Sequence, residues 1–215
     1  MRPGDLPHIV RARILPAMSA DPALRIERNS PEIEAAFDAA PSICVAEIIH
    51  GALHVMPRPA RPHTNAASNL GALLVPPLRF GTGGPGGSVI LNEPELHLGP
   101  RPDKLVPDLA GWRRARMPDA VGVESTPAHY DTVPDWICEI LSARTEVVDR
   151  GDKMPIYARE GVSHAWLVDP VSKTLEMFRL EGNRWRPPVA HRGDGRVRVE
   201  PFEAIEIDLA LLWSR

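Results

Sequence analysis

The sequence predicts an α+β (mixed α/β) fold in a single domain of ordinary size. The chain has 215 residues, of which 43% are hydrophobic and 25% are charged, as is usual for a globular domain with one core. Its apolar runs are short and rich in β-branched and aromatic residues, which is typical of strands. These runs alternate with helix-like segments in the order helix, three strands, helix, strand, and this order indicates the mixed class.

The domain is predicted to span residues 30–215, after an N-terminal arm or extension of residues 1–29. The arm carries scattered proline and arginine residues with weak periodicity and lacks the apolar centre of a signal peptide. No uncharged apolar run approaches the length of a membrane span. We therefore expect a cytoplasmic protein without a membrane partner.

Two elements are predicted before residue 60. Ser30 and Pro31 are typical of a helix N-cap and first helical residue, so a short helix should begin there and end before Pro41. Residues 43–56 predict a β-hairpin, because two β-rich arms flank the His50-Gly51 dipeptide.

A helix and a glycine-rich segment are predicted next. Residues 63–80 show leucines at helical spacing, and the Pro76-Pro77 pair is expected to end the regular part of this helix. Residues 81–87 (GTGGPGG) lack the spacing and the Lys-Ser/Thr of a phosphate-binding loop. They are expected to form a surface loop.

The second half of the chain predicts more strands than helices. Three strands are expected, at residues 88–98, 105–112 and 136–142. The loop of residues 116–134 is long enough to be a candidate lid or substrate-contacting segment. The remaining elements are a helix at 145–160 that stops at Gly161, a strand at 164–169, a hairpin at 175–186, and a β-rich run and short helical tail after residue 195.

Three residues in the second half of the chain are candidates for a catalytic metal site. Asp108 and Glu139 lie in apolar, β-prone runs, and Lys153 follows the second run. A buried carboxylate needs a partner, and carboxylate oxygens are the ligands that Mg²⁺ or Mn²⁺ prefers. Each residue could instead have an ordinary structural role. Asp108 could be a turn residue, Glu139 could belong to a strand-end ion pair, and Lys153 could lie on a solvated helix face.

The net charge gives little support to a nucleic-acid partner. The chain has 25 basic and 28 acidic residues, so its net charge is −3. Phosphate contact would need a local basic cluster, and the best candidate is the group of Arg113, Arg114 and Arg116, with a solvated loop as the alternative. His63, at a helix start, could contact phosphate or act as an acid, whereas the alternative is a helix-capping or surface role. Glu93 and Glu95 lie two apart, so a second metal position is conceivable there.

Several segments in linked order resemble the Uma-type family of restriction endonucleases, a bacterial branch of the PD-(D/E)XK nuclease superfamily. The resemblance covers about residues 43–213. The matching segments are AEIIHGALHVMPRP (46–59), NEPELHLG (92–99), VPDLAGWRR (106–114), CEILS (138–142), DRGDKMPIYAREGVSHAWLVDP (149–170) and the strand at 175–180.

The resemblance implies a restriction-endonuclease-like core, with a central mixed β-sheet flanked by helices and an added N-terminal β-hairpin. Asp108 matches the aspartate of the family's PD dipeptide and would be the bridging metal ligand. Glu139 matches the acidic member of the (D/E)XK element, with the Ile140 carbonyl as a possible further ligand. Leu141 stands where the superfamily lysine is usual, so the displaced Lys153 would take its role.

Glu47 matches an upstream glutamate of the family and would be a further metal ligand, unless it is only a hairpin charge. The implied activity is metal-dependent hydrolysis of DNA phosphodiester bonds, with Mg²⁺ or Mn²⁺ as cofactor and Lys153 orienting the attacking water. A homodimer is expected by analogy alone. The alternative is a non-catalytic scaffold that keeps the fold, whereas a glycosidase would leave Lys153 without a role.

Overall fold

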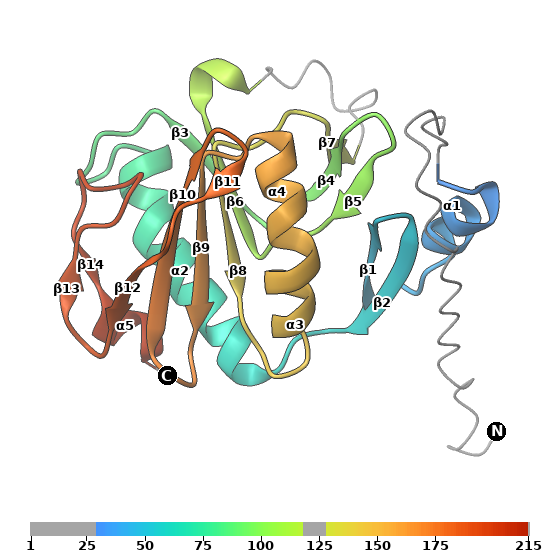
Figure 1. Ribbon diagram of the computed structural model, residues 1–215. Helices are drawn as coiled ribbons and strands as arrows, with labels where there is room; N and C mark the ends of the chain where they lie inside the picture. The colour runs from blue at the N-terminus through green and yellow to red at the C-terminus, as the bar shows by residue number, and fades with distance from the viewer. Residues whose placement is uncertain (1–28, 118–127, 215) are drawn as a thin grey trace.

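The larger of the β-sheets forms the centre of the molecule (Figure 1). A computed structural model describes residues 29–117 and 128–214. In this sheet β8 and β9 are parallel and the other pairs are antiparallel, so the mixed sheet is confirmed. Its strands, in spatial order, are β11 (Arg184–Trp185), β10 (Thr174–Glu181), β9 (His164–Asp169), β8 (Trp136–Ile140), β6 (Leu109–Arg113) and β3 (Ser88–Asn92), with β12 (Val189–Arg192) also paired to β10.

A smaller, five-stranded sheet lies beside the larger one. The predicted hairpin is confirmed, and it forms one edge of this second sheet. The order is β2 (Ala52–Pro57), β1 (Cys44–Ile49), β5 (Asp103–Leu105), β4 (Glu95–Leu98) and β7 (His129–Tyr130), and β7 is parallel to β4. A two-stranded ribbon joins β13 (Arg196–Val197) to β14 (Ile207–Asp208).

Helices cover both faces of the larger sheet, as Figure 1 shows with α4 in front and α2 behind. Because side chains alternate along a strand, β8 supplies residues to two cores: Trp136, Cys138 and Ile140 pack with α2, whereas Ile137 packs with α4. Glu139 therefore faces α4. The helical segments are α1 (Pro31–Asp38), α2 (Arg61–Arg79), the 3₁₀ turn Arg114–Arg116, α3 (Glu146–Val148), the π-helical turn η2 (Asp149–Lys153), α4 (Met154–Glu160) and α5 (Leu209–Trp213).

Three predictions about helix ends and turns, each based on neighbouring residues, are confirmed. The Ser30 hydroxyl accepts a hydrogen bond from the Ile33 N–H at 3.3 Å and caps α1. His50 and Gly51 both have positive φ, 52° and 74°, as a tight hairpin turn requires. Gly161 ends α4 in the left-handed conformation, with φ 84°.

Three predictions about element ends were wrong. Helix α2 continues through Pro76-Pro77 to Arg79, because Leu78 is buried in the core beside the sheet and this packing outweighs the lost hydrogen bonds. The strand expected at 88–98 breaks at Glu93, whose φ is 45°, so β3 and β4 enter different sheets. The strand expected at 105–112 also divides, into β5 and β6.

The candidate lid at 116–134 lies partly outside the described residues, which omit 118–127. Its described part contains β7, so it is not a continuous loop. Within the described ranges, no helix has both the length and the apolar character that crossing a membrane would require.

Candidate active site

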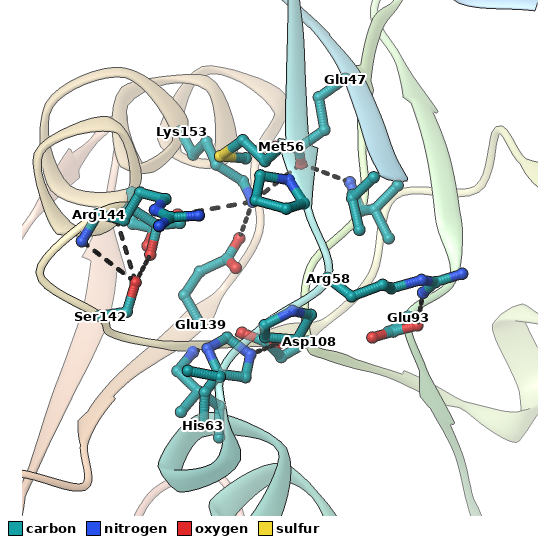
Figure 2. A pocket seen from close by; sticks show the side chains of 18 of the residues that line it. Glu47, Met56, Arg58, His63, Glu93, Asp108, Glu139, Ser142, Arg144 and Lys153 are labelled. Atoms are coloured by element: carbon teal, nitrogen blue, oxygen red, sulfur yellow. Dashed lines mark hydrogen bonds and ion pairs between the residues drawn. The ribbon is translucent and has the colours of Figure 1, made fainter. Parts of the chain in front are cut away.

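A cavity of about 710 Å³ lies where β1, β8 and the π-helical turn meet the start of α2. Figure 2 shows acidic and basic side chains directed into it from all of these elements. The titratable residues that line it are Glu47, Arg58, His63, Glu93, Asp108, Glu139, Arg144, Asp149 and Lys153. The three predicted catalytic residues are thus on the walls of one cavity.

Lys153 is a buried residue of the cavity wall that contacts three carboxylates. Its ammonium lies 2.9 Å from an oxygen of Glu47, 2.9 Å from an oxygen of Glu139 and 3.7 Å from Asp149. Lys153 and Glu139 are each only 2% exposed and Glu47 only 1%. The lysine is therefore not on a solvated helix face, and Glu139 is not a strand-end charge.

The local fold explains how a lysine so far from Glu139 in sequence reaches it. Residues 149–153 form a π-helical turn, in which Asp149 and Lys153 both point inward. Pro155 follows closely, and its ring would clash with the Gly151 carbonyl in a regular α-helix. Such π turns are often found at functional sites.

Asp108 lies just before β6 and joins the start of α2 to β8. One of its oxygens accepts a hydrogen bond from the Ile140 N–H at 2.6 Å, and the other lies 2.5 Å from Nε2 of His63. His63 is therefore not a simple helix cap, because it holds a carboxylate of the site. The Ile140 backbone contacts Asp108 through its N–H, and Ile140 also lines the cavity.

Burial and mutual repulsion shape the protonation of the cluster. Burial raises the pKa of Glu139 well above its usual value, and Lys153 only partly offsets this effect. Burial also raises the pKa of Asp149. Burial disfavours the ammonium of Lys153, yet Glu139 and Glu47 raise its pKa well above the usual value. Lys153 is thus held charged among more acids than it can neutralise.

Tyr157, one turn beyond Lys153, fixes Glu139 from the same side. Its hydroxyl donates a hydrogen bond to the Glu139 carboxylate at 2.6 Å. Burial, together with the nearby Glu139, raises the pKa of Tyr157 well above its usual value, so the phenol remains a donor. Glu139 is therefore held in one orientation by two donors, Tyr157 and Lys153.

The donor set fits a hard divalent cation. One oxygen of Glu47 accepts from the Val106 N–H at 2.7 Å, whereas its other oxygen is buried without a hydrogen-bond partner. An unpaired buried carboxylate oxygen is costly, and an ion would satisfy it. Glu47, Asp108 and Glu139 would hold such an ion. In the described structure they do not all place an oxygen within 4.8 Å of one another, and Lys153 lies between Glu47 and Glu139.

Three residues proposed from the sequence do not join this cavity. Arg113 pairs with Asp135, and Arg114 donates to the carbonyls of Arg79 and Ser88. Arg113 ends β6, about 16 Å along the strand from Asp108, and Arg114 begins the 3₁₀ turn that follows. Glu95 lies 2.7 Å from His97 and does not line the cavity, unlike Glu93.

The structure adds residues that the sequence reasoning missed. Asp149 and Tyr157 flank Lys153 at intervals of four, and this helical spacing was the signal that could have identified them. Arg58 and Arg144 are exposed at the cavity, and Arg58 forms a 3.1 Å ion pair with Glu93. No local pattern marked these two arginines, because the cavity brings together segments that are distant in sequence.

Comparison with known proteins shows that this fold is shared with a putative nuclease. The structure matches the crystal structure of a putative nuclease belonging to DUF820 from Anabaena variabilis, with a TM-score of 0.62, 19% sequence identity, and coverage of 84% of this chain and 96% of that one. No curated protein matches the sequence.

The family model described as "Uma2: Putative restriction endonuclease" matches residues 35–211. The chain therefore belongs to the Uma2 family. This match confirms the resemblance drawn from the sequence motifs, and the solved structure confirms the nuclease-like fold.

Proposed function

We propose that this protein is a metal-dependent endonuclease that hydrolyses phosphodiester bonds in DNA. The observation that carries the proposal is the buried cluster in which Lys153 contacts both Glu47 and Glu139 beside an unpaired carboxylate oxygen. Membership of a family described as restriction endonucleases supports the choice of substrate.

The ion would be Mg²⁺ or Mn²⁺, because the available ligands are carboxylate oxygens. Asp108 and Glu139 would hold it, with Glu47 and the Ile140 carbonyl as further ligands. Such an ion polarises a phosphoryl oxygen and lowers the pKa of a bound water. Burial at this depth strengthens every charge interaction inside the cavity.

The protein's own groups position the reactants. Lys153 remains charged, so it orients the attacking water and stabilises the negative charge that grows on the phosphate. His63 and the Ile140 N–H fix Asp108, while Tyr157 fixes Glu139. These contacts hold Asp108 and Glu139 in place before the substrate binds.

The DNA backbone would enter through the exposed side of the cavity. Arg58 and Arg144 are the cationic side chains there that are not buried, and we assign them the phosphate contacts that the sequence had suggested for Arg113 and Arg114. For cleavage of both strands of a duplex, two copies of the chain would act together, one on each strand.

The proposal is tested with supercoiled plasmid in Mn²⁺ or Mg²⁺. We expect nicking or cleavage that chelation abolishes, and that Asp108→Ala or Glu139→Ala reduces by at least about 10²-fold, the scale for loss of a key electrostatic group. Asp194→Asn is the matched control, because Asp194 pairs with the half-exposed Lys173 and does not line the cavity.

Folding of each variant is checked by circular dichroism. If plasmid stays intact in Mn²⁺ at high protein concentration, the alternative of a non-catalytic scaffold replaces the proposal. If both carboxylate variants remain active, the site has been assigned wrongly.

A further inference from the structure

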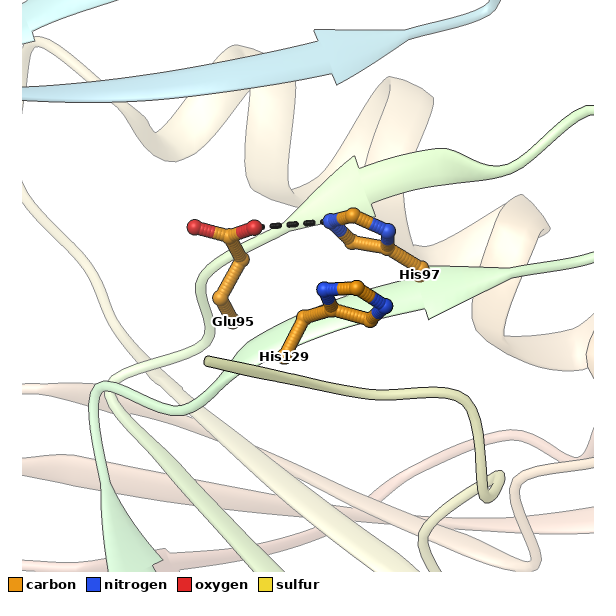
Figure 3. Close-up of side chains that lie close together, drawn as sticks. All are labelled: Glu95, His97 and His129. Atoms are coloured by element: carbon orange, nitrogen blue, oxygen red, sulfur yellow. Dashed lines mark hydrogen bonds and ion pairs between the residues drawn. The ribbon is translucent and has the colours of Figure 1, made fainter. Parts of the chain in front are cut away.

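A second cluster of potential metal ligands lies in the smaller sheet, outside the cavity. Glu95, His97 and His129 each offer one ligand atom, and these three atoms lie within 4.8 Å of one another. Figure 3 shows their side chains gathered on one side of β4 and β7. None of the three lines the cavity that holds Lys153.

Strand geometry produces this cluster. Glu95 and His97 are two residues apart on β4, so they project from the same face, while Leu96 and Leu98 project into the core and are fully buried. Strand β7 runs parallel to β4 and places His129 directly beside Glu95. Residues distant in sequence therefore converge through sheet pairing.

The contacts within the cluster are close. The imidazole rings of His97 and His129 stack with centroids 3.7 Å apart and planes 5° apart. Nε2 of His97 lies 2.7 Å from a Glu95 oxygen. The His97 side chain is 11% exposed, and those of His129 and Glu95 about a third, so a small ion can reach the site from solvent.

The charges around the cluster favour a cation. Asp131 lies 3.6 Å from Nε2 of His129 and adds a second carboxylate. The nearest lysine, Lys104, is paired with Glu34 at 2.6 Å, so its charge is largely neutralised. Among the described residues, the carboxylates of Glu95 and Asp131 thus lie beside the two imidazoles.

We propose that Glu95, His97 and His129 form a second metal site, which binds a late first-row divalent ion of the Zn²⁺ type. Two imidazoles and one carboxylate are a ligand set that Zn²⁺ accepts, with a fourth position left for water. Imidazole nitrogen discriminates against Mg²⁺, which prefers oxygen ligands. The two sites thus differ in the metal they select.

Occupation requires one movement. Stacked imidazoles hold their lone pairs parallel, whereas ligands of one ion must point toward a common centre. One ring therefore turns about its Cβ–Cγ bond, a torsion that is soft for histidine. The bound ion fastens β7, which has only two residues, to β4, so its role is to clamp this strand in the smaller sheet.

The test uses the untagged full-length chain and Co²⁺, whose visible absorption bands report nitrogen and oxygen ligands. With excess Mg²⁺ present to occupy the proposed active site, we expect one equivalent of Co²⁺ to give these bands and to be displaced by Zn²⁺. His129→Gln and Glu95→Gln should each weaken binding at least about tenfold, and His191→Gln, on remote β12, should leave it unchanged. Asp108→Asn should also leave it unchanged, which separates this site from the proposed active site.

Hydrogen exchange tests the clamp. Zn²⁺ should slow exchange of the β7 amides in the natural chain and not in His97→Gln. Absence of Co²⁺ bands, or equal affinity in folded His129→Gln, overturns the site. Binding without any slowing of β7 exchange overturns the clamping role.

Discussion

Lys153 compensates the negative charge of the buried acids in the proposed active site. It is the charged partner of Glu47 and Glu139, at 2.9 Å from each, and all three side chains are almost fully buried. Removing one member of a buried ionic group leaves the others uncompensated. The cost of losing the lysine should therefore depend on whether a cation can replace its charge.

We predict that Lys153→Met lowers the free energy of unfolding by about 3–5 kcal/mol without divalent metal, and that Mg²⁺ restores more stability to this variant than to the natural chain. Urea denaturation with and without Mg²⁺ measures both effects. The control is Lys173→Met, which breaks a pair that is about half exposed and should cost about 0–1 kcal/mol. Equal losses in the two variants would contradict the buried-cluster account.

The two exposed arginines at the cavity, Arg58 and Arg144, are expected to contact DNA phosphates. Arg58→Ala and Arg144→Ala should each weaken DNA binding and reduce its salt dependence by about one phosphate contact. Arg113→Ala should change neither, because Arg113 is 73% exposed and pairs with Asp135 at the far end of β6. Fluorescence anisotropy with a labelled duplex, in Ca²⁺ to prevent cleavage, makes the comparison. A larger effect at Arg113 would move the DNA path to that end.

Strand β6 shows how tightly the elements near the site are packed. It lies between β3 and β8, and Asp108 immediately precedes it. A Cβ atom at Gly111 would lie 2.8 Å from Cδ1 of Ile90 and 3.1 Å from Cε3 of Trp136. An added methyl group would therefore force the buried Ile90 and Trp136 side chains to shift.

We predict that Gly111→Ala destabilises the protein by about 1–3 kcal/mol, the usual cost of overpacking a core. Gly195→Ala is the matched control, because a Cβ there meets no atom within 4 Å. Urea denaturation of the two variants measures the difference. A loss at Gly195 as large as that at Gly111 would show that packing is not the cause.

At the scale of the whole molecule, two hydrophobic cores lie on opposite faces of the larger sheet. Strand β8 contributes to both, and each of its five residues is buried. The smaller sheet has an edge strand, β2, in which no residue is buried. Stability should therefore be distributed unevenly over the fold.

We predict that the amides of β8 and β9 exchange with solvent most slowly, and those of β2 and β12 much faster. Strands β8 and β9 are paired on both sides and covered by helices, whereas β2 is an edge strand. Hydrogen exchange measured by mass spectrometry tests the order. Protection of β2 equal to that of β8 would show that the two sheets unfold as one unit.

The sequence alone determined the features that depend on neighbouring residues. These are the mixed class, the turn at His50-Gly51, the cap at Ser30 and the stop at Gly161, because turn and cap chemistry acts within a few residues. The family motifs, which are also local, single out Asp108, Glu139 and Lys153. The proposed roles of these three residues remain predictions for the experiments above.

Only the tertiary structure decided what depends on sheet order and register. It placed Glu47 against Lys153, paired His63 with Asp108, divided the strand at Glu93, and carried α2 past Pro76. Convergence through space is set by how strands pair and how cores pack, and these long-range contacts leave no periodic signal in the chain. The cluster of Glu95, His97 and His129 arose in the same way, from the pairing of β4 with β7.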